Sequence, residues 1–278
     1  LTRSSAASDV YKRQYIGRVM DSEVVVSAFQ DDSLGSDDAI VIAEKIKKGE
    51  LDAKTVTRDA IRRAELVNPK LNAITEENFD FALANSEKTF SGIFQGVPTF
   101  IKDTDEVPGL PLYLGSRSLP GEPSEKFSKA AKQIIDTGLN CLGTTTTPEF
   151  GLTGTTESLR FGATCNPWNP AYSTGGSSGG SSALVAAGVI PIAHANDGAG
   201  SIRIPASCCG LVGLKASRGR IKDKEVPGYL PANILHDGVV TRSVRDTWAF
   251  HAEIEKNIPA KEYPAIGNIS ESFPEKLK

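Results

Sequence analysis

The first third of the chain repeats apolar residues at helical spacing, with charged residues on the opposite side. Ser36 is placed to cap the first helix and Gly49 to end it, while Pro69 is expected to end the second. Helices are predicted over 35–50, about 55–67 and 78–90, with a short strand at 71–75. The part of the chain from about 36 to 95 is therefore predicted to be mostly helical.

A different pattern begins at residue 96, where short apolar runs alternate with helical segments. Strands are predicted within 96–104, 140–148 and 210–217, and helices over 129–139 and 179–190. Alternating strands and helices indicate an α/β domain built around a mostly buried sheet. Because no long polar linker interrupts the pattern, we expect one domain over 36–278, with its core at about 96–250.

The composition excludes several classes of protein. The chain has 278 residues, a net charge of −3 and no basic stripe, which argues against direct binding of nucleic acid. No apolar run approaches the roughly 20 residues that a membrane-spanning helix needs. The cysteines have no CxxC spacing and are expected to be buried, reduced thiols; they are Cys141, Cys165, Cys208 and Cys209. With the histidines scattered, a zinc site is not expected, and these features together favour a cytoplasmic protein.

The two ends of the chain differ from the rest. Residues 1–14, LTRSSAASDVYKRQ, resemble translated adapter sequence, so we expect a non-native tail there and a flexible segment over 15–35. The last residues, ESFPEKLK, are typical of the approach to a further element. We therefore expect the domain to be truncated at its C-terminus.

Two neighbouring segments are rich in glycine and serine: STGGSSGGSS at 173–182 and NDGAGSIRIPAS at 196–207. Neither is a linker, because apolar runs adjoin both, and neither is a P-loop, because no Lys follows the glycines. GGSSG also fits the GxSxG pattern of a nucleophile elbow, with Asp223 and His236 as nominal partners. That match is weak, since a proline-rich loop rather than a strand precedes it.

A third interpretation uses both segments. Glycines let main-chain N–H groups turn toward one point, as an oxyanion hole requires, and Ser201 at the end of such a loop could attack a carbonyl. No histidine is well placed as a base. A buried lysine can serve instead, because desolvation lowers its pKa, and Lys102 follows an apolar strand.

These residues resemble the amidase signature family. The segments GVPTFIKD, NPWNP, STGGSSGGS, GSIRIPAS and VGLK occur in that family's order, and the likeness covers about residues 36–250. The second glycine-rich segment is most similar to the branch that contains 6-aminohexanoate-cyclic-dimer hydrolase. The resemblance implies an α/β fold whose mixed central sheet is covered by helices on both faces.

The resemblance also implies a Ser–cis-Ser–Lys triad, with a cis peptide bond between Gly176 and Ser177. Lys102 would be the base, Ser177 the bridging serine and Ser201 the nucleophile. The oxyanion hole would be formed by the amides of Gly198, Ala199, Gly200 and Ser201. Three residues would support the site: Gly176, Asp197, which could orient the triad or bind local amides, and Arg203, which we expect to tie loops together.

The implied activity is hydrolysis of carboxamide C–N bonds in small molecules through an acyl-enzyme, with no metal or organic cofactor. The sequence leaves open whether the chain forms a homodimer. Two alternatives remain: a glutaminase like that of the amidotransferases, which releases ammonia from glutamine for a tRNA-linked substrate, and an inactive truncated fragment. The sequence does not identify the acyl group or the leaving amine.

Overall fold

The computed structural model describes residues 25–217, 220–221 and 234–256, so the nominal elbow partner Asp223 and the proposed tail lie outside the described residues. The helices are α2 (Ala39–Lys47), α3 (Ala53–Leu71), α4 (Phe79–Asn85), α5 (Lys129–Ile135), α6 (Gly179–Ala186), α7 (Arg203–Cys209) and α8 (Val244–Glu255), with a short 3-10 turn at Glu149–Gly151. The strands are β1 (Ile74–Glu77), β2 (Pro98–Lys102), β3 (Asn140–Thr145), β4 (Glu157–Ser158), β5 (Gly162–Ala163), β6 (Ile192–Asp197), β7 (Val212–Gly213) and β8 (His236–Thr241).

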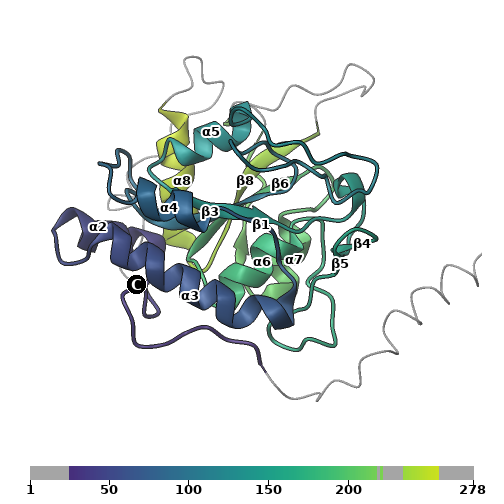
Figure 1. Cartoon of the computed structure of the whole chain (residues 1–278), viewed down its shortest axis with the longest axis horizontal. Helices are drawn as coiled ribbons and strands as arrows, with labels where there is room; N and C mark the ends of the chain where they lie inside the picture. The colour runs from purple at the N-terminus through teal and green to yellow at the C-terminus, as the bar shows by residue number, and fades with distance from the viewer. Residues whose placement is uncertain (1–24, 218–219, 222–233, 257–278) are drawn as a thin grey trace, which may run out of the picture.

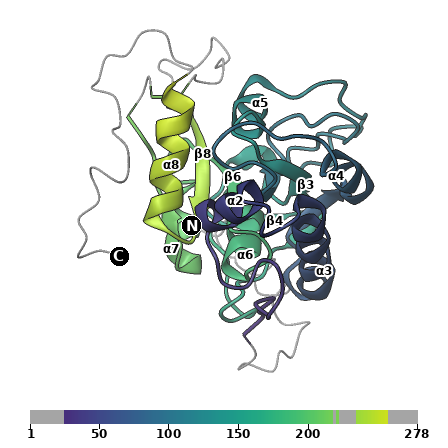
Figure 2. The same cartoon turned by 90° about the vertical axis from the view of Figure 1, so that its left-hand side faces the viewer.

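Two three-stranded sheets form the centre, in the orders β1-β3-β2 and β6-β8-β7. β2 pairs with β3 in parallel, whereas β1 and β3, β6 and β8, and β7 and β8 pair antiparallel. β2 contacts β6, so the two sheets meet along these strands. α5 lies on one side of the central strands and α6 on the other in both views (Figures 1 and 2). The expected α/β fold with a mixed arrangement of strands is confirmed.

The seam between β2 and β6 is joined by side chains. The Thr99 hydroxyl donates to the carbonyl oxygen of Ile192 at 3.0 Å, and the main-chain N–H of Lys102 donates to Nδ1 of His194 at 3.2 Å. All four residues are fully buried. Buried main-chain groups need partners, and here side chains supply them in place of a strand ladder.

The N-terminal helices form largely as predicted, with two corrections. Asp38, not Ser36, caps α2, because its carboxylate accepts the N–H of Val41 at 3.1 Å. Pro69 lies inside α3 and does not end it. Asn68 explains the difference: its carbonyl oxygen accepts the N–H of Asn72 and its side chain accepts the N–H of Ala73, both at 2.8 Å, so one more turn is held past the proline.

Residues 25–35, where we expected a flexible segment, pack against the helical layer. Val26 and Leu34 are buried. The buried guanidinium of Arg63 forms an ion pair with Asp32 at 2.5 Å and donates to the carbonyl oxygen of Gly188 at 2.6 Å. This segment is therefore tied to both α3 and the turn after α6.

The region after residue 200 differs most from the prediction, since α7, β8 and α8 were not expected. α7 also corrects the prediction for one cysteine: Cys209 is buried, but Cys208 is exposed, because consecutive residues of a helix point in different directions. Cys141 and Cys165 are buried as expected. Within the described ranges, no helix combines the length and apolar character that crossing a bilayer requires.

Candidate active site

Lys102 ends β2 and is completely buried. Its Nζ lies 2.7 Å from Oγ of Ser177 and 2.7 Å from Oδ1 of Asn196. Burial disfavours the charged form of an amine, and both of these partners are neutral. The end of β2 thus places an amine against a hydroxyl, which is the arrangement a proton relay needs.

Ser177 is buried, and the peptide bond between Gly176 and Ser177 is cis, as expected. The glycines on either side are required by close approach. A methyl group at Gly176 would lie 2.5 Å from the carbonyl oxygen of Thr155, and one at Gly179 would lie 2.2 Å from Oγ1 of Thr156. Thr156 also accepts the N–H of Gly179 at 3.0 Å, so it caps the beginning of α6. The glycine-serine segment is therefore a packed element and not a linker.

Ser201 lies beside this segment, because the N–H of Ser178 donates to its carbonyl oxygen at 3.2 Å. Exposure increases from Lys102 and Ser177, which are buried, to Ser201, which is partly buried, and to Ala199, which is exposed. The lysine end of the cluster therefore faces the interior, and the Ser201 end faces the exterior, where a substrate could reach it.

Asp197 anchors the loop that carries Ser201. Its carboxylate accepts the N–H groups of Gly200 at 2.7 Å and Ile202 at 3.2 Å, and it pairs with the guanidinium of Arg203 at 2.9 Å. Burial alone would raise the pKa of Asp197, but these hydrogen bonds, with Arg203 contributing most, hold it below its usual range. The N–H of Gly200 is thereby committed to Asp197. Of the four amides expected to face an oxyanion, this leaves those of Gly198, Ala199 and Ser201 as candidate donors to it.

Comparisons with known proteins identify the family. The amidase family model matches residues 55–278. The chain belongs to the amidase family. A putative amidase, AmiC, of Mycobacterium tuberculosis (strain ATCC 25618 / H37Rv) is 45% identical over 258 residues, which is 91% of this chain and 54% of that protein. The 6-aminohexanoate-cyclic-dimer hydrolase of Paenarthrobacter ureafaciens is 42% identical over 218 residues, 75% of this chain and 43% of that protein.

Solved structures agree. A 6-aminohexanoate cyclic dimer hydrolase complexed with substrate has a TM-score of 0.73 and 38% identity, covering 84% of this chain and 49% of the other. A bacterial aryl acylamidase of the amidase signature family has a TM-score of 0.75 and 32% identity, covering 82% and 50%. The chain thus spans about half the length of the curated relatives it matches.

Asn196 is a neighbour of Lys102 that our sequence reasoning missed in this amidase-family chain. Its side-chain amide accepts from Lys102 and donates to the hydroxyl of Thr104 at 2.6 Å. A signal was present: residues two apart in a strand share a face, so His194 and Asn196 of β6 project alike. Both contact Lys102, across the seam with β2.

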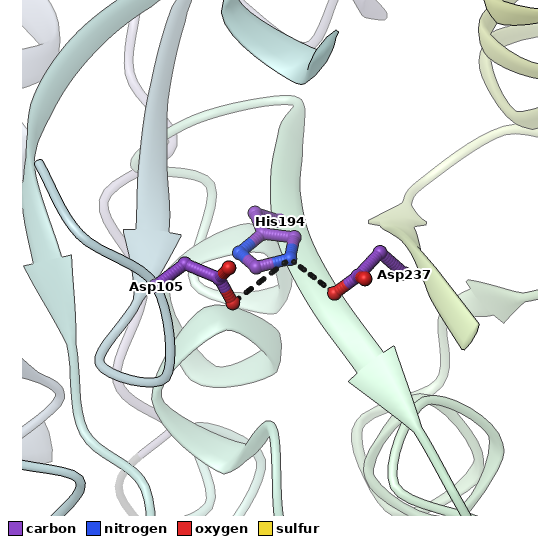
Figure 3. Close-up of side chains that lie close together, drawn as sticks. All are labelled: Asp105, His194 and Asp237. Carbon is purple, nitrogen blue, oxygen red and sulfur yellow. Dashed lines mark hydrogen bonds and ion pairs between the residues drawn. The ribbon is translucent and has the colours of Figure 1, made fainter. Parts of the chain in front are cut away.

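His194 lies between two buried carboxylates (Figure 3). Its Nε2 is 3.4 Å from Oδ1 of Asp237 and 3.9 Å from Oδ2 of Asp105, a grouping that resembles a metal site. Nδ1, however, accepts the N–H of Lys102. A neutral imidazole has one N–H, so the proton is on Nε2, which therefore donates to Oδ1 of Asp237 and has no lone pair for a metal. We assign the cluster to hydrogen bonding and not to metal binding.

Asn166 and Arg203, two further residues near the site, have structural contacts. Asn166 donates to the carbonyl oxygens of Ser173 at 3.1 Å and Cys208 at 2.9 Å, and so ties the loop before Ser177 to α7. Arg203 binds Asp197, which precedes it in the same loop, so this contact does not link two loops. His236, one nominal partner of the elbow alternative, is buried, and neither ring nitrogen has a hydrogen-bond partner among the described residues. That alternative gains no support from His236.

Proposed function

We propose that the chain provides the catalytic machinery of an amide hydrolase, with Lys102 as base, Ser177 as relay and Ser201 as nucleophile. The observation that carries the proposal is the buried Nζ of Lys102, 2.7 Å from Oγ of Ser177. The contact between Ser178 and Ser201 supports it, because it brings the nucleophile loop against the relay serine.

The reaction proceeds through two acyl transfers. The neutral amine of Lys102 takes the proton of Ser177, which takes the proton of Ser201, and Oγ of Ser201 bonds to the amide carbonyl carbon. The C–N bond then breaks as the relayed proton is delivered to the leaving nitrogen. Water, deprotonated along the same route, attacks the ester and releases the acid, and Ser201 recovers its proton.

We assign stabilisation of the developing oxyanion to the loop from Gly198 to Ser201. Asp197 supports this assignment, since it accepts the N–H of Gly200 within the loop and those of Ile202 and Arg203 directly after it, while Ala199 is exposed. Fixed main-chain donors stabilise a tetrahedral intermediate because they need no reorganisation during the reaction.

The turn before β4 favours an apolar acyl group. A methyl group at Gly151 would lie 3.3 Å from Oγ of Ser177, so this turn adjoins the relay serine. Its neighbours Phe150 and Leu152 are exposed by 47% and 81%. A panel of linear and cyclic amides with increasingly apolar acyl groups is the appropriate first screen.

The experiment compares hydrolysis of such amides by the wild-type chain and by Ser201→Ala, Ser177→Ala and Lys102→Ala. We expect Ser201→Ala to lose activity by about 1,000-fold or more, since the attacking atom is removed. Ser207→Ala is the matched control, because Ser207 is an exposed serine on α7, the helix that follows Ser201. Wild-type turnover by Ser201→Ala would contradict the proposal.

A glutamine-dependent activity is the second candidate. One component of the glutamyl-tRNA(Gln) amidotransferase of Methanosarcina mazei is 36% identical over 206 residues, 74% of this chain and 43% of that protein. Strict dependence on glutamine as the amide, with no turnover of apolar amides, would favour this candidate over the first.

A further inference from the structure

We propose that His194 is a positioning residue for Lys102, holding the main chain at the base through Nδ1 while Asp237 accepts from Nε2. The inference rests on the proposed function, in which Lys102 is the base. Nδ1 of His194 lies 3.2 Å from the main-chain N of Lys102, and the imidazole and both carboxylates are buried. Figure 3 shows the ring between the two aspartates.

Two sets of contacts hold Lys102, one at its amine and one at its main chain. From Nζ, the path runs to Oδ1 of Asn196 at 2.7 Å, from Nδ2 of Asn196 to the Thr104 hydroxyl at 2.6 Å, and from that hydroxyl to Oδ2 of Asp105 at 3.0 Å. Oδ2 of Asp105 lies 3.9 Å from Nε2 of His194, whose Nδ1 returns to the main chain of Lys102. Side chains of β6 therefore contact both the main chain and the amine of Lys102.

This matters because a lysine side chain is long and its amine must lie within hydrogen-bond reach of Ser177. Ordering such a side chain costs conformational entropy, and a relay tolerates little displacement. β2 and β6 belong to different sheets, so the N–H of Lys102 depends on His194 for its partner across the seam. Losing that acceptor would remove a buried hydrogen bond at the residue that must stay fixed.

The carboxylates give the ring its orientation. Asp105 also accepts the Ser128 hydroxyl at 2.7 Å, and Asp237 belongs to β8, beside β6. The acceptor at Nε2, Oδ1 of Asp237 at 3.4 Å, favours the tautomer with its proton there, which leaves the lone pair of Nδ1 for Lys102. The two ring nitrogens thus have separate tasks, and different substitutions can remove them one at a time.

The first test uses His194→Asn, His194→Gln and His194→Leu in the full chain. Asn places an acceptor where Nδ1 was and removes the donor at Nε2, while Gln does the reverse. The rate at which a fluorophosphonate modifies Ser201 reports activation of that serine without requiring turnover. We expect His194→Asn to stay within about threefold of wild type, and His194→Gln and His194→Leu to fall by about 10- to 100-fold.

The half-saturating concentration of the fluorophosphonate should be the same for wild type and the His194 variants, since His194 is buried. His251→Asn is the matched control, because it also replaces a buried histidine but lies on α8, and its rate should equal that of wild type. Equal rates in all three His194 variants, or a faster Gln than Asn variant, would overturn the proposal.

The second test does not depend on reactivity. The chain has 3 histidines, so ¹⁵N–¹H correlations of the imidazoles can be assigned by their loss in single variants. At about pH 8, above the ordinary histidine pKa of about 6.5, His194 should show the Nε2–H tautomer. A proton on Nδ1 would overturn the proposal.

The outcomes separate this inference from the proposed function. A wild-type chain that does not react at Ser201, or a Lys102→Ala variant that reacts as fast, contradicts the function. In that case an Nε2–H tautomer would still support the contact between Nδ1 of His194 and the main chain of Lys102, but the positioning role would be contradicted together with the function. Normal wild-type reactivity, loss in Lys102→Ala and no effect at His194 contradicts the positioning role alone.

Discussion

The side-chain oxygen of Asn196 lies 2.7 Å from Nζ of Lys102, so the second partner of this buried amine is a neutral amide. A carboxylate at that distance would hold a proton on the lysine, whereas an amide orients the amine without adding a charge. Asn196 in turn is held by Thr104. A charge introduced at position 196 would therefore lie directly beside the amine of Lys102.

Asn196→Asp is therefore expected to disable the base while keeping the shape of the site. A negative oxygen beside Nζ favours the ammonium form, so the acidic limb of the pH–rate profile should move upward by about one unit or more. Asn169→Asp adds the same charge in the loop before Ser177 and should leave the profile unchanged. Superimposable profiles for Asn196→Asp and wild type would contradict this account.

Asp197 is expected to stabilise the nucleophile loop, because its buried carboxylate binds two amides and Arg203. Asp197→Asn should lower the free energy of unfolding by about 3 kcal/mol, because main-chain N–H groups of the loop and the guanidinium of Arg203 lose a charged acceptor. Arg203→Gln should cost about 1 kcal/mol or less, because the arginine side chain is 51% exposed.

The same carboxylate predicts a pH dependence. Its pKa is depressed in the folded chain, so its stabilisation is present above the unfolded pKa of about 3.9 and is lost as the pH falls toward the folded value. The difference in urea stability between wild type and Asp197→Asn should shrink on acidification. A difference that grows at low pH would contradict the assigned charge.

Position 151 is expected to require glycine for activity, because it lies close to Ser177, the proposed relay serine. Alanine there would place a methyl group 3.3 Å from Oγ of Ser177, at a residue whose φ is +66°. Gly49→Ala is the matched control, because Gly49 has φ +74° and open space around it. Both variants should lose about 1–2 kcal/mol of stability through backbone strain. Only Gly151→Ala should also lose kcat, by about tenfold or more, and equal kcat values would contradict the placement of this turn.

Asp246 should make stability fall as the pH rises. Burial, with the nearby carboxylate of Asp38, raises its pKa to about 7 against the opposing hydrogen bonds from the N–H groups of Ala39 and Ile40. The folded chain therefore binds a proton that the unfolded chain releases between about pH 4 and 7, and its contribution declines across that window. Urea unfolding of Asp246→Asn should lack this decline, whereas Asp136→Asn, at an exposed position, should keep it. If the free energy of unfolding of Asp246→Asn fell with pH as steeply as that of wild type, the raised pKa of Asp246 would be contradicted.

The segments that hold Lys102 and Ser177 could be predicted, because strand pattern and glycine spacing are local, whereas the role expected of Ser177 came from the resemblance to the amidase signature family. β2 ends at Lys102 and α6 begins at the glycines, as expected. The roles of His194 and Asn196 could not be predicted, since they depend on which strand lies beside β2. Pro69 and Cys208 were misassigned for a related reason: Asn68 carries α3 past the proline, and the register of α7 turns Cys208 outward.

The most direct test of the central claim is to identify the residue that becomes acylated. The chain would be mixed with an activated amide such as an acyl p-nitroanilide, quenched in acid during turnover, and mapped by peptide mass spectrometry. We predict the acyl group on Ser201, its accumulation slowed in Lys102→Ala and its absence in Ser201→Ala. Turnover with the acyl group on another side chain, or with no dependence on Lys102, would contradict the account.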